Sequence, residues 1–405
     1  MNLGSTGGAD LRAFLAEKSQ FFARTPGFRS LFDDLDLDEA SRVERLWASL
    51  CALRVGDPAS AEAHSEFLVR SMPDEDDGQG ALAVRTFAES ILARARQAGS
   101  AGGNLYLDAR PPGAQLRAFE LLRLRTPLIP FAYAAGNRAL LDAMEAPGPV
   151  TIIDVGIGRG GQIRALLRNP SARRLFTSVR VVGVEPDSSS DTGTGALELA
   201  EHNVLRTAQE VGIPATFHGI ASRAEDLELG QLEAAGLTGT VIANSAFSLH
   251  HVPATDDPEG GRARVLRLLR RARVRAFVLV EPDSNHYEDD VLLRFPHAYR
   301  HYRTVSRSLH QLLSPGDASL VWNEFFAPEV RNVISHEGSE RTERHEESAS
   351  WLLRLHAADW QPQRVDGLVP QAAAPSGFTV DSRSSAFSLT FRGVALLSVM
   401  RAVPV

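Results

Sequence analysis

A glycine-rich turn between a predicted strand and a predicted helix constrains this chain more than any other segment. Residues 150–161 read V-T-I-I-D-V-G-I-G-R-G-G: a β-branched run, Asp154, and then four glycines. The helical pattern Q-I-R-A-L-L follows at once. Because glycines permit positive φ and a close backbone approach, this segment predicts an α/β sheet with a nucleotide-like ligand at a helix N-terminus.

The ligand of this turn is open to two interpretations, because Gly156, Gly158 and Gly161 also satisfy the GxGxxG pattern of dinucleotide-binding proteins. Asp154 argues for the other interpretation, since NAD-binding turns usually carry an apolar residue there. The pattern D-x-G-x-G resembles the first motif of class I methyltransferases that use S-adenosylmethionine. In those enzymes the acid organises the aminoacyl end of the ligand, and the glycine loop, here including Gly160, passes beside it.

A second acid stands at the end of the next predicted strand. The apolar run 179–184 ends in Glu185, and a carboxylate at this strand end can accept both ribose hydroxyl protons in either cofactor class. A glycine turn that binds nothing is the remaining alternative. Because Asp154 and Glu185 each stand where an apolar strand ends, we favour S-adenosylmethionine as the cofactor, with S-adenosylhomocysteine as its product.

The composition narrows the class of protein. A length of 405 residues predicts a large core with an accessory region, and a net charge of −7 argues against a general nucleic-acid-binding surface. Cys51 is the only cysteine, so an intrachain disulfide and a cysteine-based zinc site are excluded, and we expect no metal. Without an apolar run of about 18 residues or a basic–apolar leader, we expect a cytoplasmic protein with no membrane partner.

Hydrophobic periodicity predicts a helical N-terminal part and an α/β remainder. Apolar residues recur at helical spacing from about residue 11 to residue 96, as in a bundle of four or five helices, whereas residues 1–8 are expected to be disordered. After residue 150, predicted strands alternate with helices, the last of which is 288–313. The tail 378–399 alternates like two antiparallel strands around a Ser/Arg turn. This pattern predicts a mainly parallel, Rossmann-like methyltransferase sheet with an antiparallel C-terminal hairpin.

Polar residues follow the third and fourth predicted strands. Arg223, Ala224 and Glu225 come after strand 215–219, where a methyltransferase reads the adenine, although acids at a helix N-terminus explain them equally well. Asn244 ends strand 240–243 and is a candidate ligand of the methionine amine or of a substrate.

Histidines near the ends of two strands are the candidates for catalysis. His250 and His251 follow the fourth strand, and an imidazole can take a proton from a hydroxyl at neutral pH. Glu281, Asn285 and His286 follow the fifth strand. A structural histidine, or a polar loop with a capping role, is the alternative at each place. Two such clusters on adjacent strands favour a ligand site at the carboxyl edge of the sheet.

The segment 331–346 carries densely alternating charge. Such a pattern usually indicates a solvated face. Here the apolar pair Val333-Ile334 and the following Glu337-Gly338 predict instead an ordered segment whose charges pair internally.

The combined motifs resemble the GRAS domain. Blocks of that domain recur in order, and they are Phe131–Tyr133 with Asn137–Leu140, Asn244-Ser245 with Leu249-His250, Val280-Glu281 with Asn285-His286 and Arg294-Phe295, and Arg331–Val333 through Arg344-His345-Glu346 to Trp351. Plant members close on Ser-Ala-Trp, where this chain has Ser398-Val399-Met400, and His336 replaces the cysteine of their Cys-Glu-Gly block. The intact D-x-G-x-G turn and the lack of a long N-terminal extension are typical of a bacterial member.

The resemblance implies a methyltransferase-like core, 131–405, under a helical cap, 9–130, to which helix 288–313 contributes. It also implies a small-molecule pocket between core and cap, for which Tyr133, Asn137, His251 and Asn285 are the candidate substrate ligands. His250, His286 and Glu281 are the candidate catalytic residues of a methyltransferase acting on a small molecule. The alternative is a non-catalytic regulator that binds a small ligand or a protein partner. An NAD-dependent oxidoreductase is a third hypothesis, disfavoured by Asp154 and the antiparallel tail.

Overall fold

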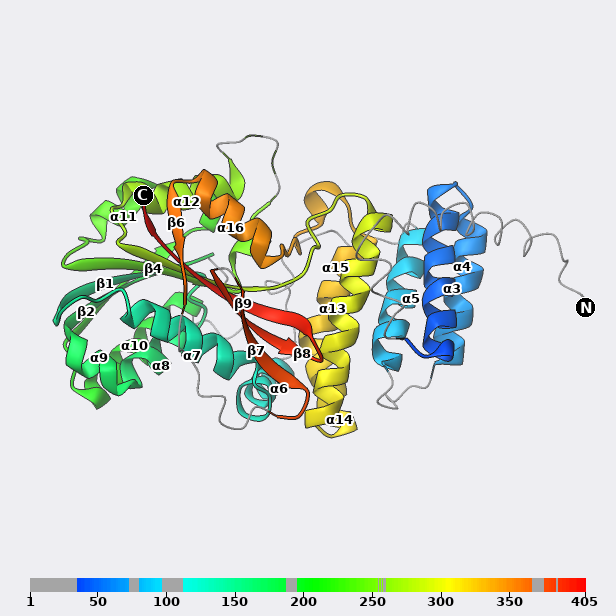
Figure 1. Cartoon of the computed structure of the whole chain (residues 1–405), viewed down its shortest axis with the longest axis horizontal. Helices are drawn as coiled ribbons and strands as arrows, with labels where there is room; N and C mark the ends of the chain where they lie inside the picture. The colour runs from blue at the N-terminus through cyan, green and yellow to red at the C-terminus, as the bar shows by residue number, and fades with distance from the viewer. Residues whose placement is uncertain are drawn as a thin grey trace, which may run out of the picture. The chain divides into compact units, whose positions relative to one another are not determined.

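The chain divides into two compact units. The computed structural model describes residues 35–72, 80–96, 112–186, 195–253, 255, 257, 260–365, 375–383 and 385–405. The first unit comprises Met1–Gly102 and Asn285–Arg341, and the second comprises Gly103–Ser284 and Thr342–Val405 (Figure 1). The predicted disordered start 1–8 lies outside the described residues.

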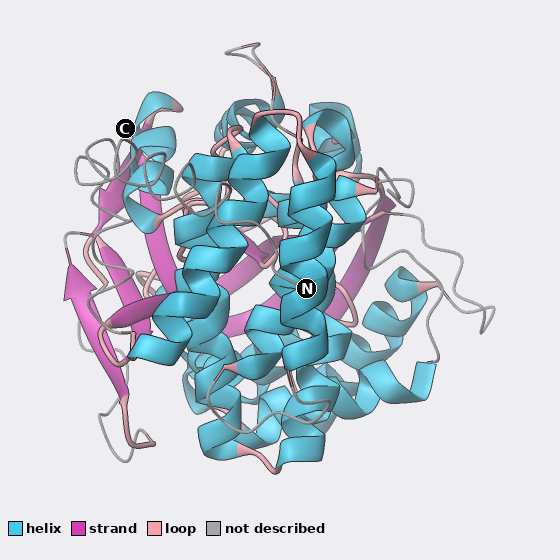
Figure 2. Ribbon diagram, turned by 90° about the vertical axis from the view of Figure 1, so that its right-hand side faces the viewer, coloured by secondary structure: helices cyan, strands magenta, loops and turns pink. Residues whose placement is uncertain are grey.

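The first unit is built from helices, and its described residues contain no strand (helices are cyan in Figure 2). Its α-helices are α3 (Leu37–Arg54), α4 (Pro58–Ser71), α5 (Ala81–Ala95), α13 (Val291–Leu312), α14 (Pro315–Val321) and α15 (Ala327–Ser335). Buried aromatic rings join α5 to α13, with the Phe87 centroid 5.6 Å from that of Phe295 and 5.2 Å from that of Tyr299. Helix α3 adds the buried Glu39, which accepts hydrogen bonds from Arg303 and Arg307 of α13. These contacts unite segments that are far apart in the sequence.

The second unit is organised around a nine-stranded sheet. The strands are β1 (Gly148–Val155), β2 (Phe176–Glu185), β3 (Ala215–Ala221), β4 (Thr240–Ala246), β5 (Ala276–Pro282), β6 (Trp360–Gln363), β7 (Phe378–Arg383), β8 (Ala386–Phe391) and β9 (Val394–Pro404). Their order is β3-β2-β1-β4-β5-β9-β8-β7, and β6 also pairs with β9. Strands β1 to β5 are parallel, whereas β9 runs antiparallel to β5. The predicted α/β sheet with an antiparallel C-terminal end is confirmed.

The antiparallel end is larger than the predicted hairpin. Strands β7 and β8 pair antiparallel as predicted, but a second turn at Arg392-Gly393 begins a further strand, β9. Both turn residues have positive φ, 49° and 79°, which is the two-residue geometry that matches the twist of paired strands. The prediction of two strands in this tail was therefore wrong by one, because the short Arg-Gly turn interrupts an otherwise continuous apolar pattern.

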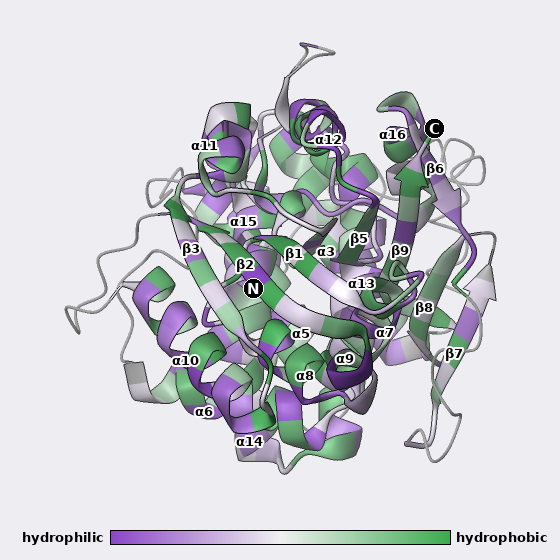
Figure 3. Ribbon diagram, turned by 90° about the vertical axis from the view of Figure 1, so that its left-hand side faces the viewer, coloured by the Kyte–Doolittle hydropathy of each residue, from purple (hydrophilic) through white to green (hydrophobic). Residues whose placement is uncertain are grey.

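Helices cover both faces of the sheet (Figure 1). One face carries α7 (Leu128–Leu141), α8 (Gly161–Arg168), α9 (Pro170–Leu175) and α10 (Ala196–Val211), and the other carries α11 (Leu229–Ala234), α12 (Gly261–Arg271) and α16 (Ser348–Ala357). The buried apolar core includes Ile153, Leu266, Phe277, Trp351 and Trp360. Figure 3 shows the central strands mainly as apolar and α12 mainly as hydrophilic. The parallel strands, covered on both faces, therefore read as the continuous apolar runs seen in the sequence.

The observed units differ in their bounds from the predicted ones. Helix α6 (Pro112–Arg125) belongs to the second unit, whereas the prediction assigned 9–130 to a cap. The first unit also takes the whole of 285–341 rather than one helix. That the first unit acts as a cap over the second stays a prediction. Among the described residues, no helix is both long and apolar enough to cross a membrane.

Candidate functional site

The glycine turn joins the end of β1 to α8 at the carboxyl edge of the parallel strands. Gly156, Gly158 and Gly160 have φ of 81°, 52° and 73°, and Gly160 immediately precedes α8. The N–H groups of Gly156 and Ile157 both donate to the carbonyl of Val184, at 2.8 and 3.2 Å, which ties the turn to the end of β2. Glycine is therefore required here by backbone conformation, as the sequence predicted.

Asp154 is held in a buried polar network. The Asn244 side-chain amide, on β4, donates to Asp154 Oδ1 at 2.7 Å, in accord with the register that places Asn244 beside Asp154. Gln162, in the first turn of α8, donates to Asn244 Oδ1 at 3.0 Å. Asn137 of α7 donates to the Gln162 carbonyl at 3.2 Å. The candidate residues Asp154, Asn244 and Asn137 thus form one network, to which Gln162, not predicted from the sequence, is the link.

Burial perturbs the acids of this site. It raises the pKa of Asp154 to about 7, an effect that the Asn244 hydrogen bond opposes and the nearby Glu185 reinforces. Burial also raises the pKa of Glu185, whose Oε2 accepts from the Gly158 N–H at 2.9 Å. Tyr133 of α7 lies beside the turn, and burial followed by the charge of Asp154 raises its pKa to about 12. Perturbed groups gathered at the carboxyl edge of a sheet are typical of a functional site.

The residues after β3 are less enclosed. Ala224 and Glu225 begin the short 3-10 helix η1 (Ala224–Asp226), and Arg223 before it is exposed. Arg264 of α12 donates to the carbonyls of Glu225 and Leu227 at 2.6 and 2.8 Å. These hydrogen bonds support the structural explanation of the segment 223–225. Contact of this segment with an adenine stays a prediction.

The polar residues after β4 and β5 meet in one buried cluster. His250 and His251 lie in the 3-10 helix η2 (Leu249–His251), and the His250 Nδ1 is hydrogen-bonded to Glu281 of β5 at 2.5 Å. The Leu249 N–H donates to the other Glu281 oxygen at 2.9 Å. Burial raises the pKa of Glu281 to about 7 and lowers that of His250. The structure therefore brings three of the candidate residues together, while a catalytic role for His250 or Glu281 stays a prediction.

The fifth-strand candidates Asn285 and His286 belong to the first unit. The buried His286 ring stacks on Tyr302 at a centroid distance of 5.1 Å. Asp283, in the same stretch, accepts from the Ser348 N–H at 3.0 Å and so caps the start of α16. The capping alternative considered for this loop is thus observed at Asp283. The catalytic role of His286 and the substrate role of Asn285 stay predictions.

The charged segment before α16 supplies residues that sequence reasoning missed. Glu343, Arg344, His345 and Glu346 are all buried, and Glu346 pairs with Arg262 of α12 and with Arg354 of α16. Glu343 lies among His250, His251 and His345, and three of these four residues form a group whose ligand atoms could hold a metal ion. The segment is ordered, as predicted, but its charges pair mainly with distant helices rather than internally, so that part of the prediction was wrong. His345, a histidine within a charged run, was the one sign in the sequence that this segment could be a site. Its neighbours could be identified only from the fold.

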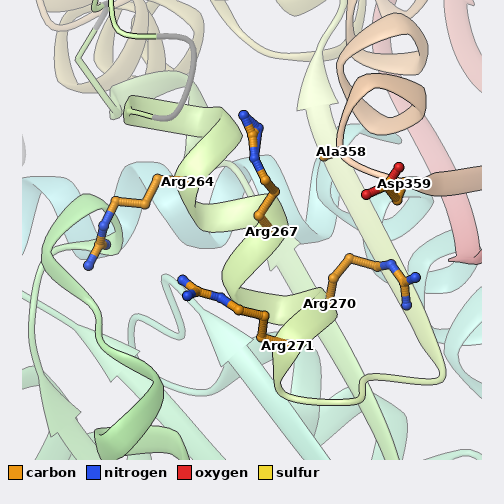
Figure 4. Close-up of a pocket in the computed structure, with 6 residues that line it drawn as sticks. All are labelled: Arg264, Arg267, Arg270, Arg271, Ala358 and Asp359. Atoms are coloured by element: carbon orange, nitrogen blue, oxygen red, sulfur yellow. The ribbon is translucent and has the colours of Figure 1, made fainter.

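A surface hollow on α12 is separate from this site. It encloses about 470 Å³ and is lined by Arg264, Arg267, Arg270, Arg271, Ala358 and Asp359. Its guanidinium groups point in different directions rather than toward one another (Figure 4). Arg270 lies over the Trp360 ring and donates to the Val405 carbonyl, so part of this charge supports the packing of β6 and β9.

Gly156→Ala is expected to destabilise the chain by on the order of 3 kcal/mol, from backbone strain at positive φ and overpacking. A Cβ at Gly156 would overlap the Ser248 side chain, whereas one at Gly158 would meet no atom within 4 Å. Gly158→Ala is the matched control, with an expected cost of about 1–2 kcal/mol. Urea unfolding of Gly156→Ala with and without Ser248→Gly measures the coupling, and purely additive costs would exclude the overlap.

The fold and the site together define the class of this protein. Five parallel strands in the order β3-β2-β1-β4-β5, extended by the antiparallel β9, form a Rossmann-like methyltransferase sheet with an acid-glycine turn after β1. The GRAS domain family matches residues 82–399, and the chain therefore belongs to that family.

Its relatives support the assignment. Scarecrow-like protein 5 of Arabidopsis thaliana is 30% identical over 76% of this chain and 54% of its own length. DELLA protein RGL3 of the same plant is 27% identical over 67% of this chain and 53% of its own length. The chain thus spans about half the length of the curated relatives it matches. The crystal structure of SCL7 from Oryza sativa has the same fold, with a TM-score of 0.74 and 20% identity over 89% of this chain and 99% of its own. Since these relatives come from plants, the bacterial origin stays a prediction.

Proposed function

We propose that this chain is a methyltransferase that binds S-adenosylmethionine at the glycine turn and methylates a small molecule. The observation that carries the proposal is the Asp154 carboxylate, which is buried at the end of β1 although burial raises its pKa to about 7. A buried carboxylate with a strongly raised pKa, at the carboxyl end of a parallel strand, is typical of a functional site. The space next to Gly158, where a Cβ would meet nothing, fits the close approach of a ligand.

The chain's own residues would hold and orient the cofactor. Glu185 stands at the end of β2 with its Oε2 on the Gly158 N–H, so it is the candidate for the ribose hydroxyls. Asp154, oriented by Asn244, is the candidate for the aminoacyl end. Bound S-adenosylmethionine would supply the activated methyl group. Positioning of the acceptor and exclusion of water would then be the main contributions of the protein.

The proposal leaves the general base unassigned. The His250 ring nitrogens face two carboxylates, since Nδ1 bonds Glu281 and Nε2 lies 3.5 Å from Glu343. Both His250 and Glu281 are almost completely buried. Such an imidazole is poorly placed to take a proton from a substrate that enters from solvent.

Isothermal titration of the full chain with S-adenosylmethionine and S-adenosylhomocysteine tests the cofactor. We expect binding, weakened about 10- to 100-fold by Asp154→Ala, because a lost hydrogen bond to a charged group is worth about 1.5–3 kcal/mol. Gly158→Ala should also weaken it, because its new Cβ enters the space that the ligand would use. The matched control is Glu201→Ala, an exposed acid of α10. If the unaltered chain bound neither S-adenosylmethionine nor S-adenosylhomocysteine at millimolar concentration, the methyltransferase proposal would be rejected.

A non-catalytic regulator is the second candidate. One relative, 28% identical over 67% of this chain, is named Scarecrow-like transcription factor PAT1, from Arabidopsis thaliana. The enclosed histidines after β4 also favour this role, because they form a packed network. A regulator would yield no methylated product from S-adenosylmethionine and a mixture of small-molecule acceptors, and Asp154→Ala would leave its binding to a partner protein unchanged. An enzyme would yield a methylated product, and Asp154→Ala would reduce its formation at subsaturating S-adenosylmethionine.

A further inference from the structure

Three imidazoles surround one buried carboxylate after β4, in a cluster separate from the glycine turn. Glu343 Oε2 lies 3.5 Å from His250 Nε2 and 3.5 Å from His345 Nε2, and Glu343 Oε1 lies 3.3 Å from His251 Nδ1. Glu343 and His345 are fully buried, His250 is 3% exposed, and the His251 side chain is 17% exposed. The side chains come from two segments that the fold brings together, η2 and the stretch before α16.

The spacing of these atoms matches the ligand shell of a small divalent cation. Zinc binds imidazole nitrogen at about 2.0–2.1 Å and carboxylate oxygen at about 2.0–2.2 Å, so neighbouring ligand atoms of a tetrahedral site lie about 3.3–3.5 Å apart. The two distances from Glu343 Oε2, to His250 Nε2 and His345 Nε2, fall at these values, and the candidate atoms of His250, Glu343 and His345 all lie within 4.8 Å of one another.

A second carboxylate orients one of the candidate ligands. Glu281 holds the Nδ1 of His250, while its other oxygen accepts from the Leu249 N–H. An Nδ1–H donated to Glu281 leaves Nε2 as the coordinating nitrogen, directed at Glu343. Metal-binding histidines almost always donate their other N–H to a carboxylate or a carbonyl in this way. Glu281 and His250 thus correspond to the carboxylate and the histidine of a carboxylate–histidine–metal arrangement.

The backbone around the cluster is also held in place. The Arg344 N–H donates to the His250 carbonyl at 3.3 Å, and the Arg262 guanidinium donates to the carbonyls of both His250 and Arg344. These bonds connect the two segments that carry the ligands. His250, Glu343 and His345 form a preformed, buried set of three protein ligands, which leaves the fourth position of a tetrahedral zinc site to a water or another ligand.

We propose that His250, Glu343 and His345 bind one divalent transition-metal ion of the zinc class, with His251 beside the other oxygen of Glu343. The ion would join the end of β4 to the segment that leads into α16. Imidazole and carboxylate ligands suit zinc, and they disfavour Mg²⁺, which prefers oxygen ligands and retained waters.

Metal analysis of the purified full chain, without S-adenosylmethionine, tests the proposal. After chelation and dialysis, we expect Zn²⁺ titration to show one site per chain, and Co²⁺ to give the visible absorption of a tetrahedral complex. Zn²⁺ should raise the melting temperature, and Mg²⁺ at the same concentration should not. Glu281→Gln, which alters the orienting carboxylate, is expected to weaken zinc binding about 10- to 100-fold.

Substitutions of the proposed metal ligands give a second test. Glu343→Gln and His345→Ala should abolish the cobalt absorption, whereas His202→Ala, an exposed histidine of α10, should leave it unchanged. If either ligand variant fails to fold, the Zn²⁺ and Co²⁺ titrations of the unaltered chain still test the proposal. A natively folded, metal-free chain that binds neither Zn²⁺ nor Co²⁺, or ligand variants that bind like the unaltered chain, would overturn the proposal. None of these readouts depends on methyl transfer, so the two proposals fail independently.

Discussion

Arg262→Ala is expected to destabilise the chain by about 3–5 kcal/mol, the range found when one partner of a buried ion pair is removed. Arg262 is 3% exposed and pairs with the buried Glu346. It also donates to the carbonyls of His250 and Arg344, at 2.9 and 2.6 Å, and lies over the Trp351 ring at 4.9 Å. Alanine would remove all of these contacts at once, although Arg354 would still bond Glu346.

Urea denaturation followed by circular dichroism measures this loss. The matched control is Arg271→Ala, an exposed arginine of the same helix, for which a change within about 0.5 kcal/mol is expected. Replacing both Arg262 and Glu346 with methionine should cost less than Arg262→Ala, because no buried charge is then left behind. Equal stabilities of Arg262→Ala and Arg271→Ala would show that the network contributes little.

Asp154→Asn is expected to stabilise the ligand-free chain at pH 8 by up to about 4 kcal/mol, from a shift of about three pKa units at 1.36 kcal/mol each. Burial raises the pKa of Asp154 in the folded chain to about 7, against about 3.9 in an unfolded chain. The folded chain therefore holds its proton to higher pH, and stability decreases as pH rises from about 4 to about 7. Asparagine removes this ionisation and can still accept the hydrogen bond from Asn244.

Unfolding curves of both proteins between pH 4 and pH 8 measure this effect. The two free energies of unfolding should nearly agree at pH 4 and diverge as pH rises. Asp226→Asn, at an exposed acid of η1, is the control and should produce no such divergence. A stabilised variant that has also lost S-adenosylmethionine binding would show that the carboxylate is kept for function at the expense of stability. An Asp154→Asn chain that is less stable at every pH would contradict the burial argument.

Local pattern predicted the glycine turn and the strand-end acids well. Asp154 is the penultimate residue of β1, Glu185 is the last residue of β2, and Asn244 lies next to Asp154 in the sheet. This success has a physical reason, since the carboxyl ends of adjacent parallel strands must meet at one edge. The Arg392-Gly393 turn was missed because a two-residue turn leaves little trace in an apolar run.

The sequence by itself therefore determined the α/β class, the glycine turn and the acids beside it, because periodicity and glycine conformation are local properties. Only the tertiary structure decided what the charged segment 341–346 does. The same pattern of alternating charge occurs in segments that face water and in segments that are buried against distant partners. Here Glu343 and His345 contact His250, which lies far away in the sequence. The fold also separated His286, which packs on Tyr302, from His250, which bonds Glu281. Such pairings depend on contacts that no short window of sequence contains.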